Sequence, residues 1–236
     1  MDICAQTVVK CMYIGAISSR ESFIREDKNV SVIIVYRRPI NWTDRILELA
    51  CGEFTHCEIY VPNIGGTFAT TVDVGMDLRF DLKQLYVLPD TAGDYAWHLL
   101  VMTEVEYQRM CAWNMEQVAH HCRYNYTDLM WQVAPYMRSF VHDVSQQDAS
   151  HPRKMFCSQA VVLALRAAFS GNDSKPHMKA FVSSMNSRLT TPGVLMTALN
   201  FYTGFSVSNE LVPMTVDVVN KFTDLAINRH RQMCVS

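Results

Sequence analysis

Residues 30–61 read VSVIIVYRRPINWTDRILELACGEFTHCEIYV, and their pattern indicates how the core of the protein begins. It opens with a β-branched run, residues 30–36, which is typical of a buried strand. Pro39 ends that strand, and a short helix then extends to Ala50. Residues 55–61 form the next strand. The stretch therefore predicts a strand–helix–strand unit at the start of the core.

More strands follow this unit along the chain. A turn with the sequence PNIGG, at 62–66, leads to a strand at 67–74, and residues 95–102 form another. Thr103 and Glu106 form a capping box for the helix behind that strand. Strands and helices do not alternate regularly. The sequence therefore predicts an α+β domain in which an antiparallel sheet is packed with helices.

Helical periodicity recurs through the second half of the chain, and no stretch reads as a linker. The expected helical segments are a short piece between Asp81 and Pro89, then 107–122, 124–141, 157–170, 190–199 and 215–232. We expect a single domain over residues 1–236, with its core at about 30–200 and with extensions at 1–29 and 201–236.

The composition bounds the kinds of partner. The net charge of −2 gives no reason to propose nucleic acid as a partner. Hydrophobic residues make up 49% of the chain, yet no apolar run approaches the roughly 18 residues of a membrane span. Eight cysteines in 236 residues do not indicate a small disulfide scaffold, and several lie on apolar stripes. We expect a reducing compartment, the cytoplasm, and no metal or other cofactor.

Two residues carry candidate chemistry. Cys157 opens the helical stretch CSQAVVLALRAAF, where the helix dipole lowers a thiol pKa and backbone N–H groups can hold an oxyanion. His56, on the strand at 55–61, can accept the thiol proton. Each has a plainer alternative: Cys157 as a structural cysteine that opens a core helix, and His56 as an ordinary half-buried histidine.

The surroundings of both residues resemble one family. The strand, helix and glycine before THCEIYV, then FCSQAVVLAL at 156–165 and TTPGVLMTAL at 190–199, follow in the order of the permuted NlpC-type papain-like cysteine enzymes. That family has bacterial and poxvirus members and is distantly related to the lecithin retinol acyltransferases. The resemblance covers residues 30–200. It implies a circularly permuted papain-like domain with Cys157 as nucleophile and His56 as base.

The same resemblance implies a reaction. Relatives attack an acyl carbon through a thioester and then hydrolyse it or transfer it. We therefore expect a cysteine hydrolase, an amidase, peptidase or esterase, that acts on a peptide, an amide or a lipid acyl group without a cofactor. We expect the Cys157 sulfur and a ring nitrogen of His56 to lie within hydrogen-bonding reach.

The residue that orients the histidine departs from the family pattern. Members usually carry a polar group there, often glutamate, on the strand after the histidine strand. The matching position is Thr70 or Thr71, and a hydroxyl stabilises imidazolium less than a carboxylate does. We expect Thr70 to take this role. Asp73 or Glu58 can complete the triad instead, and Glu58 shares a strand face with His56.

Two alternatives to a hydrolase stay open. The missing carboxylate near Thr70 favours a catalytically inactive binding or structural protein of a large DNA virus, located in the host cytoplasm or the virion. A lipid acyltransferase at a membrane surface would need an amphipathic or apolar membrane anchor, and the segment 215–232 is a weak candidate for it.

A zinc site is disfavoured by residue spacing. Its ligands would be His120, His121 and Cys122, with Cys57 or Cys51. Adjacent residues point in different directions on a helix, and the usual zinc-ligand spacings are missing from the sequence.

Overall fold

The structure is a computed structural model that describes residues 29–39, 42–80, 94–133, 142–143, 152–203 and 212–213. Several predicted segments lie outside these residues. They are the N-terminal extension before Asn29, the short helical piece after Asp81, the second half of the helix expected at 124–141, and the helix expected at 215–232.

The main sheet is antiparallel throughout, with the strand order β4-β3-β2-β1-β5-β8. Its strands are β1 (Asn29–Arg37), β2 (His56–Val61), β3 (Gly66–Thr71), β4 (Gly75–Arg79), β5 (Asp94–Thr103) and β8 (Val212–Pro213). The β-branched run of β1 lies near the centre of the sheet, between β2 and β5, and is buried on both faces. The predicted α+β class with an antiparallel sheet is confirmed.

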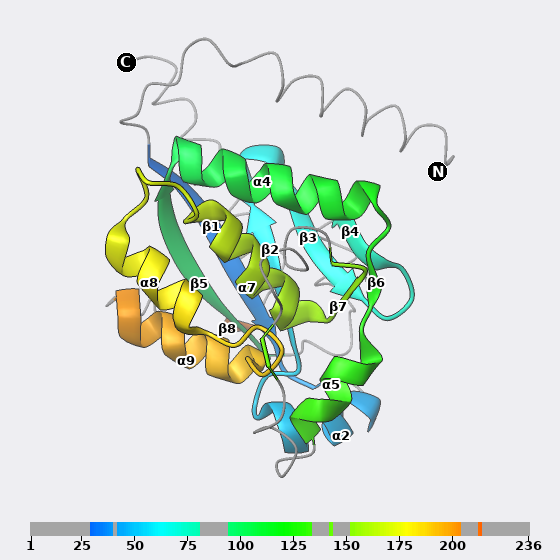
Figure 1. Ribbon diagram of the computed structural model, residues 1–236. Helices are drawn as coiled ribbons and strands as arrows, with labels where there is room; N and C mark the ends of the chain where they lie inside the picture. The colour runs from blue at the N-terminus through cyan, green and yellow to red at the C-terminus, as the bar shows by residue number, and fades with distance from the viewer. Residues whose placement is uncertain are drawn as a thin grey trace.

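Helices α4 (Glu104–Ala119), α7 (Cys157–Ala168), α8 (Pro176–Ser184) and α9 (Pro192–Thr203) lie over one face of this sheet (Figure 1). Helices α2 (Trp42–Cys51) and α5 (Tyr126–Val133) lie at one end of it, and a short 3-10 turn, η1 (Pro62–Ile64), follows β2. A two-stranded parallel pair, β6 (Arg123–Tyr124) and β7 (Lys154–Met155), leads into α7. α4 and α7 pack together against the sheet, while α2 and α5 contact each other at one end.

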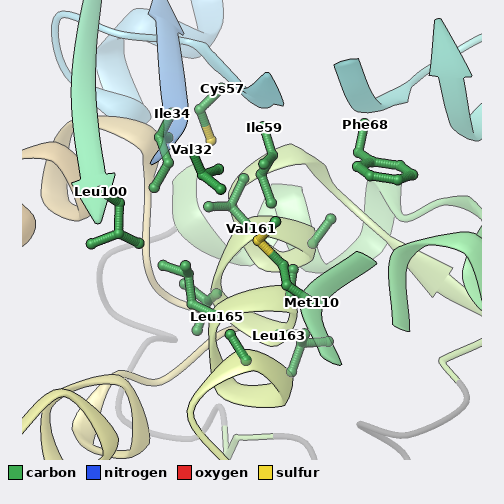
Figure 2. Close-up of a cluster of buried hydrophobic side chains, with 14 of the residues drawn as sticks. Val32, Ile34, Cys57, Ile59, Phe68, Leu100, Met110, Val161, Leu163 and Leu165 are labelled. Atoms are coloured by element: carbon green, nitrogen blue, oxygen red, sulfur yellow. The ribbon is translucent and has the colours of Figure 1, made fainter. Parts of the chain in front are cut away.

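The core lies between the sheet and α7. Alternate residues of β1 and β2 point into it, and the apolar face of α7 meets them. Figure 2 shows Val32, Ile34, Cys57 and Ile59 of the sheet above Val161 of α7. This packing places the first residue of α7 close to the first residues of β2.

The predicted capping box at the start of α4 is confirmed. The Glu106 N–H donates to Thr103 Oγ1 at 3.2 Å, and the Thr103 N–H donates to Glu106 Oε2 at 2.8 Å. Both bonds satisfy N–H groups that a helix start otherwise leaves unpaired.

The strand expected at 67–74 is wrong at its end. β3 stops at Thr71, and the chain turns into a further strand, β4, that begins at Gly75. Gly75 has a positive φ of 81°, and a Cβ added there would lie 2.3 Å from the carbonyl oxygen of Cys122. The sequence did not predict this turn, because Asp73 has a valine on each side and β-branched residues favour strands.

Replacing Gly75 with alanine should destabilise the fold more than the same change at Gly52. Both glycines have positive φ, 81° and 78°, so both variants share a cost of about 1–2 kcal/mol. At Gly52, however, an added Cβ meets no described atom within 4 Å. We expect Gly75→Ala to lose about 1–3 kcal/mol more free energy of unfolding, because of the backbone clash. Urea unfolding measures both losses, and equal losses would contradict the expectation.

Across the described residues, no helix has both the length and the apolar character that a membrane crossing demands.

Candidate active site

Cys157 is the first residue of α7, as the sequence predicts. The preceding residue, Phe156, is extended, with φ −101° and ψ 172°, and no described side chain caps the helix there. The first-turn N–H groups are therefore not taken by a capping side chain and can bind a negative charge. The thiol lies at the positive end of the helix dipole. Cys157 is only 2% exposed, so this charge effect acts away from bulk water.

His56 is the first residue of β2, and its side chain is 13% exposed. The Cys157 sulfur lies 3.9 Å from the carbonyl oxygen of Thr55, the residue immediately before this strand. The imidazole and the sulfur are close enough to interact electrostatically, and this interaction raises the pKa of His56 and lowers the pKa of Cys157. The structure therefore brings together the two residues that the sequence proposes as nucleophile and base, although they come from distant parts of the chain.

The residue that holds His56 is Glu58. His56 Nε2 lies 2.5 Å from Glu58 Oε1, which leaves Nδ1 as the ring nitrogen available to the sulfur. His56 and Glu58 are two residues apart on β2, so their side chains leave the strand on the same face. A carboxylate in this position can fix the ring orientation and stabilise imidazolium.

The assignment of Thr70 as the orienting residue is wrong. Its hydroxyl donates to Met76 Sδ at 3.1 Å. In the register of β2 and β3, Phe68 pairs with Ile59, so Thr70 shares the face of Ile59 and Glu58 lies on the other. Asp73, the other carboxylate considered, lies in the exposed turn between β3 and β4.

Two arginines surround Glu58. Arg79 Nη1, from β4, lies 3.7 Å from Glu58 Oε1, and Arg37 of β1 pairs directly with His56 in the strand register. Burial opposes ionisation of Glu58, but His56, then Arg79 and Arg37, hold the pKa of this carboxyl below its usual value. Glu58 is therefore a carboxylate at neutral pH.

The site favours a thiolate–imidazolium pair. Burial alone would lower the pKa of His56, but the Glu58 carboxylate and the Cys157 sulfur raise it to about 9. A hydrogen bond from Cys57 and the contact with His56 outweigh burial and hold the pKa of Cys157 well below its usual range. Both shifts favour the proton on the imidazole and not on the sulfur, and a thiolate is the charge state of a nucleophilic thiol.

Cys57 belongs to the site and was not predicted. Burial, followed by the interaction with Cys157, raises the pKa of Cys57 well above its usual value, and the same interaction lowers the pKa of Cys157. Cys57 thus keeps its proton while Cys157 loses its own. Side chains alternate along β2, so Cys57 points away from His56 and Glu58 and toward the helix layer that contains Cys157. This alternation could have indicated the position of Cys57.

Two tyrosines flank the site. The rings of Tyr124 and Tyr126 meet edge to face, with centroids 5.1 Å apart. Burial, and then the negative charge of Cys157, raise the pKa of Tyr124 well above its usual value. Its phenol therefore stays protonated at neutral pH.

Within the described part of the chain, no group of three or more histidine, cysteine, aspartate or glutamate side chains is arranged to hold a metal ion. The residues considered for zinc diverge: His120 and His121 are exposed at the end of α4, whereas Cys122 is buried.

A scan against protein-family models found no match for this chain, and searches of curated proteins and of solved structures found none either.

Proposed function

We propose that this chain is a cysteine hydrolase, with Cys157 as nucleophile, His56 as base and acid, and Glu58 as the residue that orients His56. One observation carries the proposal: a buried thiol at a helix start lies beside the beginning of the strand whose first residue, His56, is held by a carboxylate. Burial penalises charged groups, so a structural core gains little from assembling all three in one place.

The reaction follows from these charges. The Cys157 thiolate attacks an acyl carbon, and N–H groups of the first turn of α7 stabilise the oxyanion. The His56 imidazolium then gives its proton to the departing amine or alcohol, which leaves a thioester on Cys157. Neutral His56 next takes a proton from water, and the resulting attack releases the acid and restores the thiolate.

We further propose that the domain is circularly permuted and papain-like. In support, the histidine strand β2 precedes the nucleophile helix α7 along the chain, and α7 packs directly against the core face of that strand. The substrate is a peptide, an amide or a lipid acyl group. Cys157 is buried, so side chains over the sulfur must move before an acyl carbon reaches it, and small acyl groups are the best first probes.

An inactive binding protein is now the weaker alternative. That interpretation depended on the missing carboxylate near Thr70. Glu58 supplies a carboxylate at the imidazole from the histidine strand itself. The observation that favoured an inactive protein therefore no longer does so.

Acyl-enzyme trapping tests the proposal. Short-chain p-nitrophenyl esters should release p-nitrophenol and add one acyl group to Cys157, observed by intact mass and peptide mapping. Hydroxylamine should remove that group, as it does a thioester. Cys157→Ala should abolish both signals, whereas Cys111→Ala, which removes another buried thiol, should keep them. Acylation of another residue, with Cys157 unmodified, would overturn the assignment.

A further inference from the structure

Cys57 faces the helix layer and not the histidine side of β2. It pairs with Tyr36 in the register of β1 and β2, and both belong to the core cluster. Figure 2 shows Cys57 beside Val32, Ile34 and Ile59, above α7. The thiol is therefore presented toward the helix whose first residue is Cys157.

Cys57 and Cys157 both lie where α7 packs against β2. Cys157 reaches the beginning of this strand, with its sulfur 3.9 Å from the carbonyl oxygen of Thr55, two residues before Cys57. Both cysteines belong to the same core cluster, and they are only 1% and 2% exposed. Each of the two thiols also affects the pKa of the other. A strand and the helix packed on it can bring two such sulfurs to the bonding distance of about 2 Å.

We propose that Cys57 and Cys157 form a reversible disulfide under hydrogen peroxide, with Cys157 as the thiol that is oxidised first and Cys57 as the thiol that resolves it. The inference rests on the proposed function in one respect, that Cys157 is the reactive sulfur. It adds a modification site and a means of switching off the acyl chemistry without loss of the fold.

The chemistry balances in two steps. The Cys157 thiolate attacks one peroxide oxygen, the O–O bond breaks, and the departing hydroxide takes up a proton to become water, which leaves a sulfenic acid on Cys157. The sulfur of Cys57 then attacks the sulfur of Cys157. The S–S bond forms, the S–O bond breaks, and the hydroxide leaves as water with the proton of Cys57. In total, two thiols and one peroxide give one disulfide and two waters.

Cys51 is the competing resolving thiol. It is the last residue of α2, which packs mainly against α5 and α9, whereas Cys57 lies on β2, the strand against which α7 packs. The geometry therefore favours Cys57. A disulfide between Cys57 and Cys157 would hide the nucleophile in the oxidised protein and protect it from irreversible oxidation.

Peroxide treatment of the reduced full chain tests this without a substrate. After blocking with N-ethylmaleimide, peptide mapping should give one cross-linked species that joins Cys57 to Cys157, with a mass loss of two hydrogen atoms. Iodoacetamide labelling of Cys157 should fall by about tenfold or more and return with dithiothreitol. Sulfinic acid on Cys157 with Cys57 still reduced, or a disulfide between Cys51 and Cys57, would overturn the proposal.

Matched variants separate the two candidate partners. Cys51→Ala should behave like the wild-type chain. Cys57→Ala should oxidise to sulfinic acid at Cys157, and dithiothreitol should not restore labelling. The mass readouts do not depend on ester hydrolysis: a disulfide in a chain that forms no thioester would refute the hydrolase alone, and thioester formation without the disulfide would refute this inference alone.

Discussion

Alkylation of Cys157 by iodoacetamide should be nearly independent of pH between 6 and 9 in the wild-type chain and steeply dependent on pH in His56→Ala. The thiolate is favoured in the wild-type chain, because Cys57 and His56 hold the pKa of Cys157 well below its usual range. Removing His56 removes its positive charge from a buried site, so the pKa of the thiol should rise toward its ordinary value of about 8.5.

The size of the effect follows from the thiolate fraction. Below its pKa, a thiol gains about tenfold in thiolate per pH unit, so labelling of the variant should rise about 100-fold from pH 6 to pH 8. The pH dependence of the labelling rate therefore tests whether His56 activates Cys157. Absolute rates do not, because a thiolate of low pKa is also a weaker nucleophile. Mass-spectrometric rate mapping measures Cys157 in both proteins.

His177→Ala is the matched control, since His177 is an exposed histidine on α8 and its loss should leave the profile flat. Comparing the same cysteine across variants also holds its burial constant. Identical, steep profiles in the wild-type chain and in His56→Ala would mean that Cys157 is a structural thiol and that the enzyme proposal fails.

Local sequence signals account for much of the fold. The β-branched run of β1, the alternation of β2 and the capping box of α4 each predict their element, because burial and capping act within a few residues. Helix α8 was missed, although Met178, Phe181 and Val182 repeat at helical spacing and are buried. Its lysine and serines make the segment read as a loop, and only packing against α7 decides its structure.

The candidate site was partly predictable. Cys157 at a helix start is a local feature, but its pairing with His56 came from the order of family motifs, because contacts between distant residues are not encoded in spacing. Glu58 and Thr70 lie on opposite faces of the sheet. The face of each residue depends on strand register, which the sequence pattern did not give. Arg79 was not considered as a site residue because its strand, β4, was not predicted. The turn before Gly75 was interpreted as part of the preceding strand.

Glu58→Gln should remove the upper part of the pH range in which the site is active, whereas Thr70→Val should not. The pKa of His56 is about 9 because the Glu58 carboxylate and Cys157 outweigh burial. A neutral amide of nearly the same size keeps the packing but removes the charge. Cys157 still opposes burial, so the pKa of His56 should fall from about 9 toward its ordinary value of about 6.5.

The sign of the change in activity follows. At pH 8 the wild-type imidazole is protonated, so it can stabilise the thiolate and protonate a leaving group. In Glu58→Gln it is neutral at that pH, both contributions are lost, and we expect p-nitrophenyl ester turnover to fall on the order of 100-fold. At pH 6 the loss should be smaller, because part of the imidazole is protonated again.

Two measurements separate a role in orienting and charging His56 from a merely structural one. NMR titration of the His56 ring should show the fall in its pKa, and the pH profile of turnover should lose its alkaline half, while the urea midpoints remain similar. Thr70→Val loses only the contact with Met76, so it should keep both the pKa and the profile. If Thr70→Val lowers the pKa of His56 and Glu58→Gln does not, the imidazole is held by the hydroxyl in solution, and the role assigned to Glu58 is wrong.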